Sequence, residues 1–179
     1  MVGAYAVAMK ATSKSATPKG VTEIKNKIQW KPLLLSIGIS LGGGALSGLV
    51  TMDAMEGYAL VRQPAFAPPE WLFPVVWTVL YLLMGISAYL VWESDAPNRK
   101  RALFLYGAQL AVNLVWPVFF FNLHAFGFSF FWLLLLIALA WAMTAAFYRA
   151  VRSAALLQLP YLVWLLFAAA LNFSIWIIN

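Results

Sequence analysis

The sequence predicts an all-α membrane protein, built as a bundle of five transmembrane helices. Of its 179 residues, 64% are hydrophobic and 10% are charged, and the mean hydropathy is +0.83. A soluble domain has roughly 45–50% apolar and about 25% charged residues, so one water-soluble core could not bury this excess. The apolar residues form five runs, each near the roughly 20 residues that cross a bilayer as a helix. The runs are unbroken rather than alternating, which favours helices over a transmembrane barrel.

The five runs set the expected boundaries of the chain. None of them contains Lys, Arg, Asp or Glu. We expect residues 1–32 to form a basic, flexible N-terminal tail, with a targeting segment as the alternative. Residues 33–179 are expected to form the transmembrane domain, with an outer loop at residues 53–72. The expected spans are residues 33–52, 73–92, 102–122, 126–148 and 154–178.

Basic residues lie almost entirely on one side of these spans. Residues 1–32 and the second and fourth connections together hold eleven of the twelve Lys and Arg, and Arg62 in the first connection is the twelfth. The positive-inside rule then places the N-terminus in the cytoplasm and residues 53–72 outside. The net charge of +6 thus indicates orientation, and we expect the bilayer rather than a nucleic acid as the partner. A bacterial membrane is expected, with an organellar membrane as the alternative.

Several classes of chemistry are excluded by composition. The chain has no cysteine and one histidine, His124, which excludes disulfides, thiol catalysis and cysteine-based metal sites. No general acid, base or nucleophile set is visible in the spans, so we expect no catalytic residues, no metal and no required cofactor. The charge-free spans also argue against an ion-coupled transporter, which usually needs an ionisable group within the membrane.

Small residues four apart mark the first and third spans. This spacing lets helices approach closely, but it also leaves a smooth face against which a ligand could lie. Both interpretations stay open for the first span. In the third span the alternatives are packing inside the bundle and a contact between two copies of the chain. The pairs are Gly38 with Gly42, Gly43 with Ser47, Gly44 with Gly48, and Gly107 with Ala111.

Polar side chains and prolines interrupt the third and fifth spans. Gln109, Asn113 and Pro117 are spaced four apart and therefore share one helical face. Pro117 cannot donate a hydrogen bond to the carbonyl of residue 113, so the backbone is loosened beside these amides. The amides, with Asn172 in the fifth span, serve either interhelical hydrogen bonds or a ligand. Pro160 is expected to kink or begin the last helix.

Tryptophans within the spans predict an aromatic cavity. The chain has nine Trp, and those near span ends are typical of the interfacial belt. Trp77, Trp116 and Trp164 lie deeper, and Tyr81 follows Trp77 by one turn. If their faces converge, they line a cavity for a flat apolar ligand in the outer half of the bundle; plain core packing is the alternative. The loop at 53–72 is long for this chain and is expected to act as a lid.

Ordered motifs run from residue 40 to the end of the chain. They are Ser40-Leu-Gly-Gly, Pro64-Ala-Phe-Ala-Pro-Pro-Glu-Trp71, Trp77-Thr-Val-Leu-Tyr81-Leu-Leu-Met-Gly85, Gln109-Leu-Ala-Val-Asn113-Leu-Val-Trp116-Pro-Val-Phe-Phe120, and Pro160-Tyr161-Leu-Val-Trp164 with Phe167-Ala168 and Leu171-Asn172. With these motifs the chain resembles the translocator protein family, also called the tryptophan-rich sensory protein or peripheral benzodiazepine receptor family.

The resemblance implies a five-helix bundle, often a homodimer, whose outer-half pocket binds porphyrins such as protoporphyrin IX, synthetic aromatic ligands and, in animal members, cholesterol. Trp77 and Trp164 match tryptophans linked in bacterial members to light-dependent porphyrin breakdown. Carried over position by position, the pocket residues are Ser47, Val50, Tyr58, Phe73, Pro74, Val76, Trp77, Asn113, Trp116, Phe128, Leu135, Trp164, Ala168 and Leu171.

The chain departs from the family pattern at two places that concern ligands. Gly57 precedes Tyr58 where the family usually has Trp-Tyr, and Phe66 replaces a usual Trp, so the lid is expected to hold ligand less firmly. The family's cholesterol motif needs a Tyr and then a basic residue, whereas this chain has Phe173 and Ile177. Weak sterol binding is therefore expected.

The function that this sequence favours is a membrane receptor or transport-associated protein that binds porphyrins and related planar apolar ligands. The sequence itself supports the uncharged aromatic cavity, and the resemblance supplies the ligand. The alternatives are a light-dependent porphyrin-degrading enzyme, in which Trp77 and Trp164 would take part, and a small-molecule or sterol transporter.

Overall fold

The computed structural model describes residues 28–58 and 60–179, without the side chains of residues 55–58, and throughout this part of the chain every regular element is a helix. Five helical stretches are long and apolar enough to cross a membrane. The expected all-α bundle of five transmembrane helices is thereby confirmed. The elements are α1 Trp30–Tyr58, α2 Leu72–Trp92, α3 Arg99–Pro117, the π-helix η1 Val118–Asn122, α4 Phe126–Ala150, α5 Arg152–Leu156 and α6 Leu159–Ile178.

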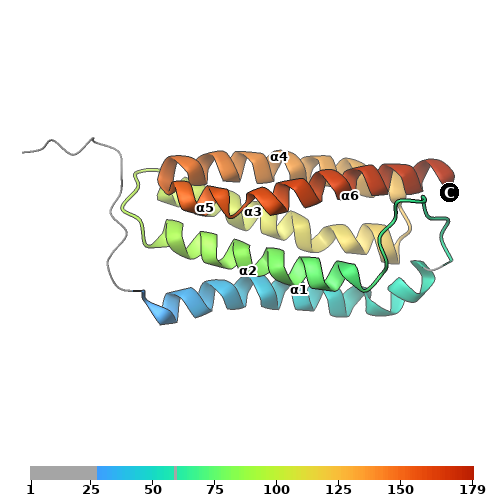
Figure 1. The fold of residues 1–179 in the computed structure, drawn as a ribbon, viewed down its shortest axis with the longest axis horizontal. Helices are drawn as coiled ribbons and strands as arrows, with labels where there is room; N and C mark the ends of the chain where they lie inside the picture. The colour runs from blue at the N-terminus through green and yellow to red at the C-terminus, as the bar shows by residue number, and fades with distance from the viewer. Residues whose placement is uncertain (1–27, 59) are drawn as a thin grey trace, which may run out of the picture.

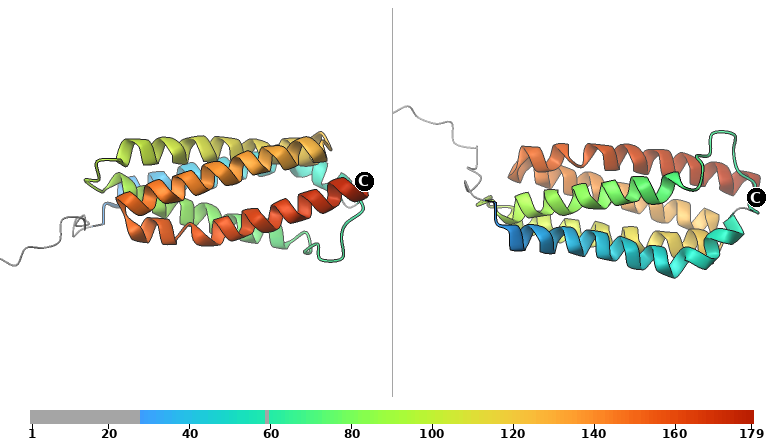
Figure 2. Two further views of the ribbon diagram at one scale, coloured as in Figure 1. Left: turned by 90° about the horizontal axis from the view of Figure 1, so that it is seen from above. Right: turned by 60° about the horizontal axis from the view of Figure 1, so that its bottom comes forward.

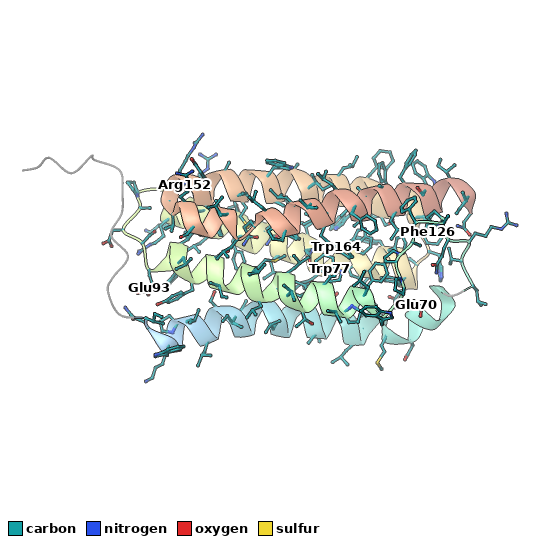
Figure 3. The ribbon with its side chains drawn as sticks, viewed as in Figure 1. Glu70, Trp77, Glu93, Phe126, Arg152 and Trp164 are labelled. Atoms are coloured by element: carbon teal, nitrogen blue, oxygen red, sulfur yellow. The ribbon has the colours of Figure 1, made fainter. Side chains whose placement is uncertain are left out.

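The helices run side by side along one long axis (Figures 1 and 2). Within this bundle α1 packs on α2, α3 on α4, and α4 on α6, while α5 continues the line of α6 and packs on α2. Glu93 and Arg152 lie at the end where α1 begins, and Glu70 lies at the opposite end, where the chain finishes (Figure 3). We name these the basic end and the loop end.

The first helix is longer than the expected span at residues 33–52. It begins at Trp30, because Pro32 lies in the first turn, where the missing N–H leaves no helical bond unmade. It continues past the expected end at residue 52 as far as Tyr58, because no Gly or Pro interrupts residues 53–56. The expected outer loop at 53–72 is therefore corrected to the segment between α1 and α2. Of the expected tail at 1–32, residues 1–27 lie outside the described part of the chain.

Prolines divide the third and fifth spans into two elements each. Beyond Pro117 the helix continues as the π-helix η1, because proline supplies no N–H for the α-helical pattern. The Val118 N–H bonds to the carbonyl of Val115, which leaves the Leu114 carbonyl for another donor. In the fifth span a turn separates α5 from α6, and Pro160 lies in the first turn of α6, as expected for a proline that begins a helix.

The backbones of α1 and α2 come closest in the half of the bundle near the basic end. A Cβ atom placed on Gly85 would lie 2.6 Å from the Ile37 Cα, and the Ser36 hydroxyl donates a hydrogen bond of 2.8 Å to the Gly85 carbonyl. Apolar lipid gives helices no hydrophobic reason to associate, so close backbone packing of this kind holds α1 in place.

Candidate ligand-binding cavity

A cavity of about 450 Å³ lies in the loop-end half of the bundle, and Figure 3 shows Trp77 and Trp164 close together there. Its volume falls within the roughly 300–1,000 Å³ of small-molecule sites. Four walls, from α1, α2, α3 with η1, and α6, enclose it, and none of the described residues on them is charged. The lining residues are Leu41, Gly44, Ala45, Ser47, Gly48, Thr51, Phe73, Pro74, Trp77, Thr78, Tyr81, Asn113, Trp116, Pro117, Phe120, Phe121, Trp164, Ala168, Leu171 and Asn172.

Aromatic rings from α2 and α6 meet on one side of the cavity. Phe73, Trp77 and Tyr81 are spaced four apart on α2 and so share a face. The Trp77 ring stacks on Tyr81 at 5.4 Å between centroids and meets Tyr161 edge-on at 6.4 Å. Phe73 meets Trp164 edge-on at 6.0 Å. The faces of the two deep tryptophans thus converge on one space, as the aromatic-cavity interpretation requires.

The opposite aromatic wall is built on Trp116. Its ring stacks on Phe120 at 5.0 Å and meets Phe121 edge-on at 6.2 Å. The Trp116 indole N–H donates to the Ser129 carbonyl on α4 at 3.1 Å, and the Asn172 amide donates to the Ser129 hydroxyl at 2.8 Å. These two bonds join α3, α4 and α6 and fix the rotation of the Trp116 ring.

A hydrogen-bond network joins α2, α3 and α6 at the cavity. The Tyr81 hydroxyl donates to Asn113 Oδ1 at 2.6 Å, and Asn113 Nδ2 donates to the Tyr161 hydroxyl at 3.2 Å. That hydroxyl in turn donates to Gln109 Oε1 at 2.8 Å. The amides were expected to serve either interhelical hydrogen bonds or a ligand. Asn113 and Gln109 make interhelical hydrogen bonds, and Asn113 also lines the cavity. A satisfied network of this kind rigidifies a site.

Small residues on α1 form the fourth wall. The Ser47 hydroxyl donates to the Leu114 carbonyl at 2.8 Å, which is the carbonyl released at the π-helical turn. A Cβ atom on Gly44 would collide with the Tyr81 ring, whereas one on Gly48 would meet nothing within 4 Å. The small-residue stripe of α1 thus contributes both close packing, at Gly44, and open space, at Gly48.

Most of the expected site residues line this cavity. Tyr58 lies at the end of α1, with its side chain outside the description, and Val76 is half-buried away from the cavity. Val50, Phe128 and Leu135 are 55%, 54% and 47% exposed on the outside of the bundle, so the structure does not bring them to the cavity. The residues that do line it are Ser47, Phe73, Pro74, Trp77, Asn113, Trp116, Trp164, Ala168 and Leu171.

Helix rotation explains the residues that the structure leaves outside. Phe128 and Leu135 are seven apart and therefore share one face of α4. The face of α4 that turns inward carries Ser129, Leu133 and Leu136, all of them buried. Because α4 has apolar residues on every side, hydropathy alone does not tell which of its faces points to the lipid.

Several lining residues were not among those expected for the site. Thr51 lies one turn after Ser47, so the four-residue spacing was its signal. Phe120 and Phe121 are consecutive and both buried. Both lie in the π-helix η1, for which Pro117 was the signal in the sequence.

One polar group on the cavity wall has no partner. Among the described residues, the Trp164 Nε1 atom is buried and makes no hydrogen bond. The hydroxyls of Ser47, Thr78 and Tyr81 all donate to protein oxygens. Because Nε1 has almost no accessible surface, this N–H faces protein rather than the open cavity, and a bound acceptor group could reach it only after the Trp164 ring turns.

The loop between α1 and α2 crosses to the end of α6 (Figures 1 and 2). The Arg62 N–H donates to Asn179 Oδ1 at 3.0 Å, and Asn179 Nδ2 donates to the Arg62 carbonyl at 3.0 Å. Phe66 meets Phe167 of α6 at 6.3 Å. None of the described loop residues, 60–71, lines the cavity, so the action of this loop as a lid stays a prediction.

Comparison with known proteins gives consistent matches over most of the chain. Residues 36–177 match the TspO/MBR family. The Translocator protein of Homo sapiens is 37% identical over 151 residues, which cover 82% of this chain and 89% of that protein. The Tryptophan-rich protein TspO of Archaeoglobus fulgidus is 39% identical over 150 residues, covering 82% and 96%. Protein CrtK of Rhodobacter capsulatus is 38% identical over 124 residues, covering 68% and 78%.

Proposed function

The chain belongs to the TspO/MBR family of membrane proteins, and from that membership we propose that its cavity binds porphyrins, such as protoporphyrin IX, and related planar apolar ligands. The protein would act as a receptor or as a transport-associated binding protein, with no required cofactor. The observation that carries the proposal is the charge-free aromatic cavity of about 450 Å³ that Trp77, Trp116 and Trp164 line together.

The chemistry of a porphyrin fits such a cavity. Its macrocycle is a broad, flat π-system, which gains buried apolar area and contacts with indole rings such as Trp77 and Trp164. The cavity offers no charge to its carboxylates, so these groups would extend toward the loop end and the membrane surface.

The function is tested by purifying the protein from cells that make tetrapyrroles. We expect the absorption spectrum and mass spectrum of the preparation to show a co-purified tetrapyrrole, and added protoporphyrin IX to quench the tryptophan fluorescence saturably. Absence of both signals from protein that is folded by circular dichroism would contradict the proposal.

The alternative functions give different signals in the same preparation. Light-dependent porphyrin oxidation is favoured by the contacts of Trp77 with Tyr81 and Tyr161, because these oxidisable rings lie beside the cavity. It predicts loss of porphyrin absorption under illumination, with none in the dark. Transport predicts that porphyrin crosses the bilayer of protein-containing vesicles, and dependence on a proton gradient would indicate coupling.

The orientation in the membrane is a second part of the proposal. Arg99 begins α3, Arg149 lies in the last turn of α4 and Arg152 begins α5, all at the basic end, whereas Arg62 lies in the loop. We therefore propose a cytoplasmic basic end, in a bacterial membrane or alternatively an organellar one. In intact cells an impermeant thiol reagent should label Ala65→Cys and not Lys100→Cys. The reverse pattern would invert the topology.

A homodimer through α3 completes the proposal. Gly107 and Ala111 are both exposed, and a Cβ atom on Gly107 would meet nothing within 4 Å. Packing inside the bundle therefore does not account for Gly107, whereas close approach of a second α3 would. Gly107→Leu should reduce cross-linked dimer in vesicles without changing helicity. An unchanged dimer fraction would exclude this contact.

A further inference from the structure

The cavity reaches the outside of the bundle on one side. The lining residues that come from α3, η1 and α6 are buried or half-buried, and none of them is exposed. On α1 and α2, by contrast, four lining residues are exposed: Ala45 and Gly48 on α1, and Pro74 and Thr78 on α2. Since α1 and α2 are neighbours in the bundle, these residues mark a gap between the two helices.

The gap opens within the membrane-spanning part of the helices. Gly48 lies inside the candidate span Trp30–Ala54, and Thr78 lies inside Leu72–Trp92. The Thr78 hydroxyl donates to the Pro74 carbonyl at 2.7 Å, so it presents no unsatisfied donor to lipid. The surrounding side chains are apolar and more than half exposed, and they are Leu46, Leu49, Val75 and Val79.

The gap and the loop end differ as routes into the cavity. The loop crosses the loop end and is tied to α6 by the pair of hydrogen bonds between Arg62 and Asn179. Among the described residues no such pair of hydrogen bonds closes the gap, and a Cβ atom on Gly48 would find no atom within 4 Å. A ligand in the acyl region therefore meets small residues and open space, whereas a ligand in water meets the loop.

We propose that the gap between α1 and α2 is a lateral portal, through which the ligand enters the cavity from the bilayer. The inference rests on the proposed function, and it narrows the ligand class to planar amphiphiles that partition into membranes. Entry from the lipid suits such a molecule because its apolar surface stays out of water along the whole route.

The test uses the full chain in phosphatidylcholine vesicles, with protoporphyrin IX as the probe. Stopped-flow quenching of tryptophan fluorescence gives the association rate, and transfer of bound porphyrin to empty vesicles gives the dissociation rate. Gly48→Leu places a side chain in the gap. Gly42→Leu is the matched control, because Gly42 is exposed on the same helix, has no atom within 4 Å of its Cβ position and does not line the cavity.

We expect Gly48→Leu to slow association and dissociation together, each by about tenfold. Because Gly48 also lines the cavity, the dissociation rate decides: a leucine that only fills the binding site would leave dissociation unchanged or make it faster. Gly42→Leu should leave both rates unaltered. Equal rates for the Gly48 variant and the unaltered protein would overturn the portal. So would slower association with an unchanged dissociation rate, since the leucine would then occupy the binding site itself.

A third variant tests the route through the loop end. Asn179→Ala removes both side-chain hydrogen bonds to Arg62, and we expect it to leave the association rate unchanged. If Asn179→Ala associates faster with the porphyrin and Gly48→Leu leaves both rates unchanged, the entrance lies at the loop end instead. If the unaltered protein shows no saturable quenching, the proposed function itself fails, an outcome distinct from normal binding with unchanged rates.

Discussion

The two halves of the α1–α2 pair use glycine for opposite purposes. Near the basic end, Gly85 lets α2 touch the backbone of α1 at Ile37, where a Cβ atom would lie 2.6 Å from the Ile37 Cα. Near the loop end, Gly48 faces open space beside the cavity. The same two helices are therefore closed in one half and open in the other. Small residues on a transmembrane helix indicate packing only when a backbone or a side chain of another helix lies opposite them.

The largest expected effect is a loss of stability when a larger side chain replaces Gly85, where α1 and α2 are in close contact. Gly85→Val forces the backbones of α1 and α2 apart, because the added atoms have no space beside Ile37. We expect a loss of about 1–3 kcal/mol or more of stability, measured as a lower thermal unfolding temperature in detergent. Gly42→Val, at a position with no atom within 4 Å, is the control. Equal unfolding temperatures for the two variants would show that the helices are not packed as described.

The open half is tested through its aromatic walls. Trp77→Ala and Trp164→Ala should each weaken protoporphyrin IX binding without unfolding the bundle. An aromatic contact is worth roughly 0.5–1.5 kcal/mol beyond area burial, so each change should cost about three- to tenfold or more in affinity. The control is Trp92→Ala, because Trp92 lies at the basic end and is 59% exposed. If all three variants bind equally weakly at unchanged stability, the binding site is not in the loop-end half.

A smaller effect separates the indole N–H of Trp164 from its ring. Trp164→Phe keeps an aromatic ring but removes the buried N–H that has no partner among the described residues. If the ring turns so that this N–H bonds to the ligand, a hydrogen bond of about 0.5–1.5 kcal/mol corresponds to roughly two- to tenfold in affinity. Trp77→Phe removes ring area and an indole N–H together at a second cavity position. A fluorescence titration of Trp164→Phe equal to that of the unaltered protein would show that its N–H makes no contribution.

The smallest effect is expected outside the cavity, on the exposed face of α6. Phe173 and Ile177 are 45% and 64% exposed there, and they provide neither the hydroxyl nor the cation of the sterol motif. A cholesterol titration should give weaker binding than the same titration of the human relative in the same lipid. Equal affinities in the two proteins would show that sterol recognition does not depend on these positions.

The sequence predicted the spans well because hydropathy and length act locally. Each run of about 20 apolar residues had to become a helix in a bilayer, whatever its neighbours. Trp77 and Trp164 were found for a similar reason, since deep tryptophans are unusual away from the interface. The end of α1 was missed, because the helix continues beyond the apolar run through Asp53, a residue that hydropathy assigns to a loop.

Rotation and backbone register could not be predicted in the same way. Phe128 and Leu135 have the composition of a pocket wall, yet they point outward. Hydropathy could not predict this direction, because α4 is apolar on every side. Phe120 and Phe121 enter the wall through the π-helix after Pro117, which adds a residue to the turn. Both outcomes depend on how neighbouring helices pack, and a single sequence contains no direct signal of that packing.

The hydrogen bonds around the cavity also divide its walls into stiff and compliant ones. In lipid there is no water to replace a broken hydrogen bond. Sliding α2, α3 or α6 would therefore leave the Asn113 amide and the hydroxyls of Tyr81 and Tyr161 without hydrogen-bond partners. A serine on α1 has a second acceptor one turn back on its own helix, and Ser40 already bonds both Tyr106 and the Ser36 carbonyl. Ser47 can therefore exchange its bond to the Leu114 carbonyl for one within α1, an exchange that the Tyr81 phenol and the Asn113 amide do not have. The α1 wall is compliant in this sense only beside the cavity, because the packing of Gly85 on Ile37 fixes the half of α1 near the basic end.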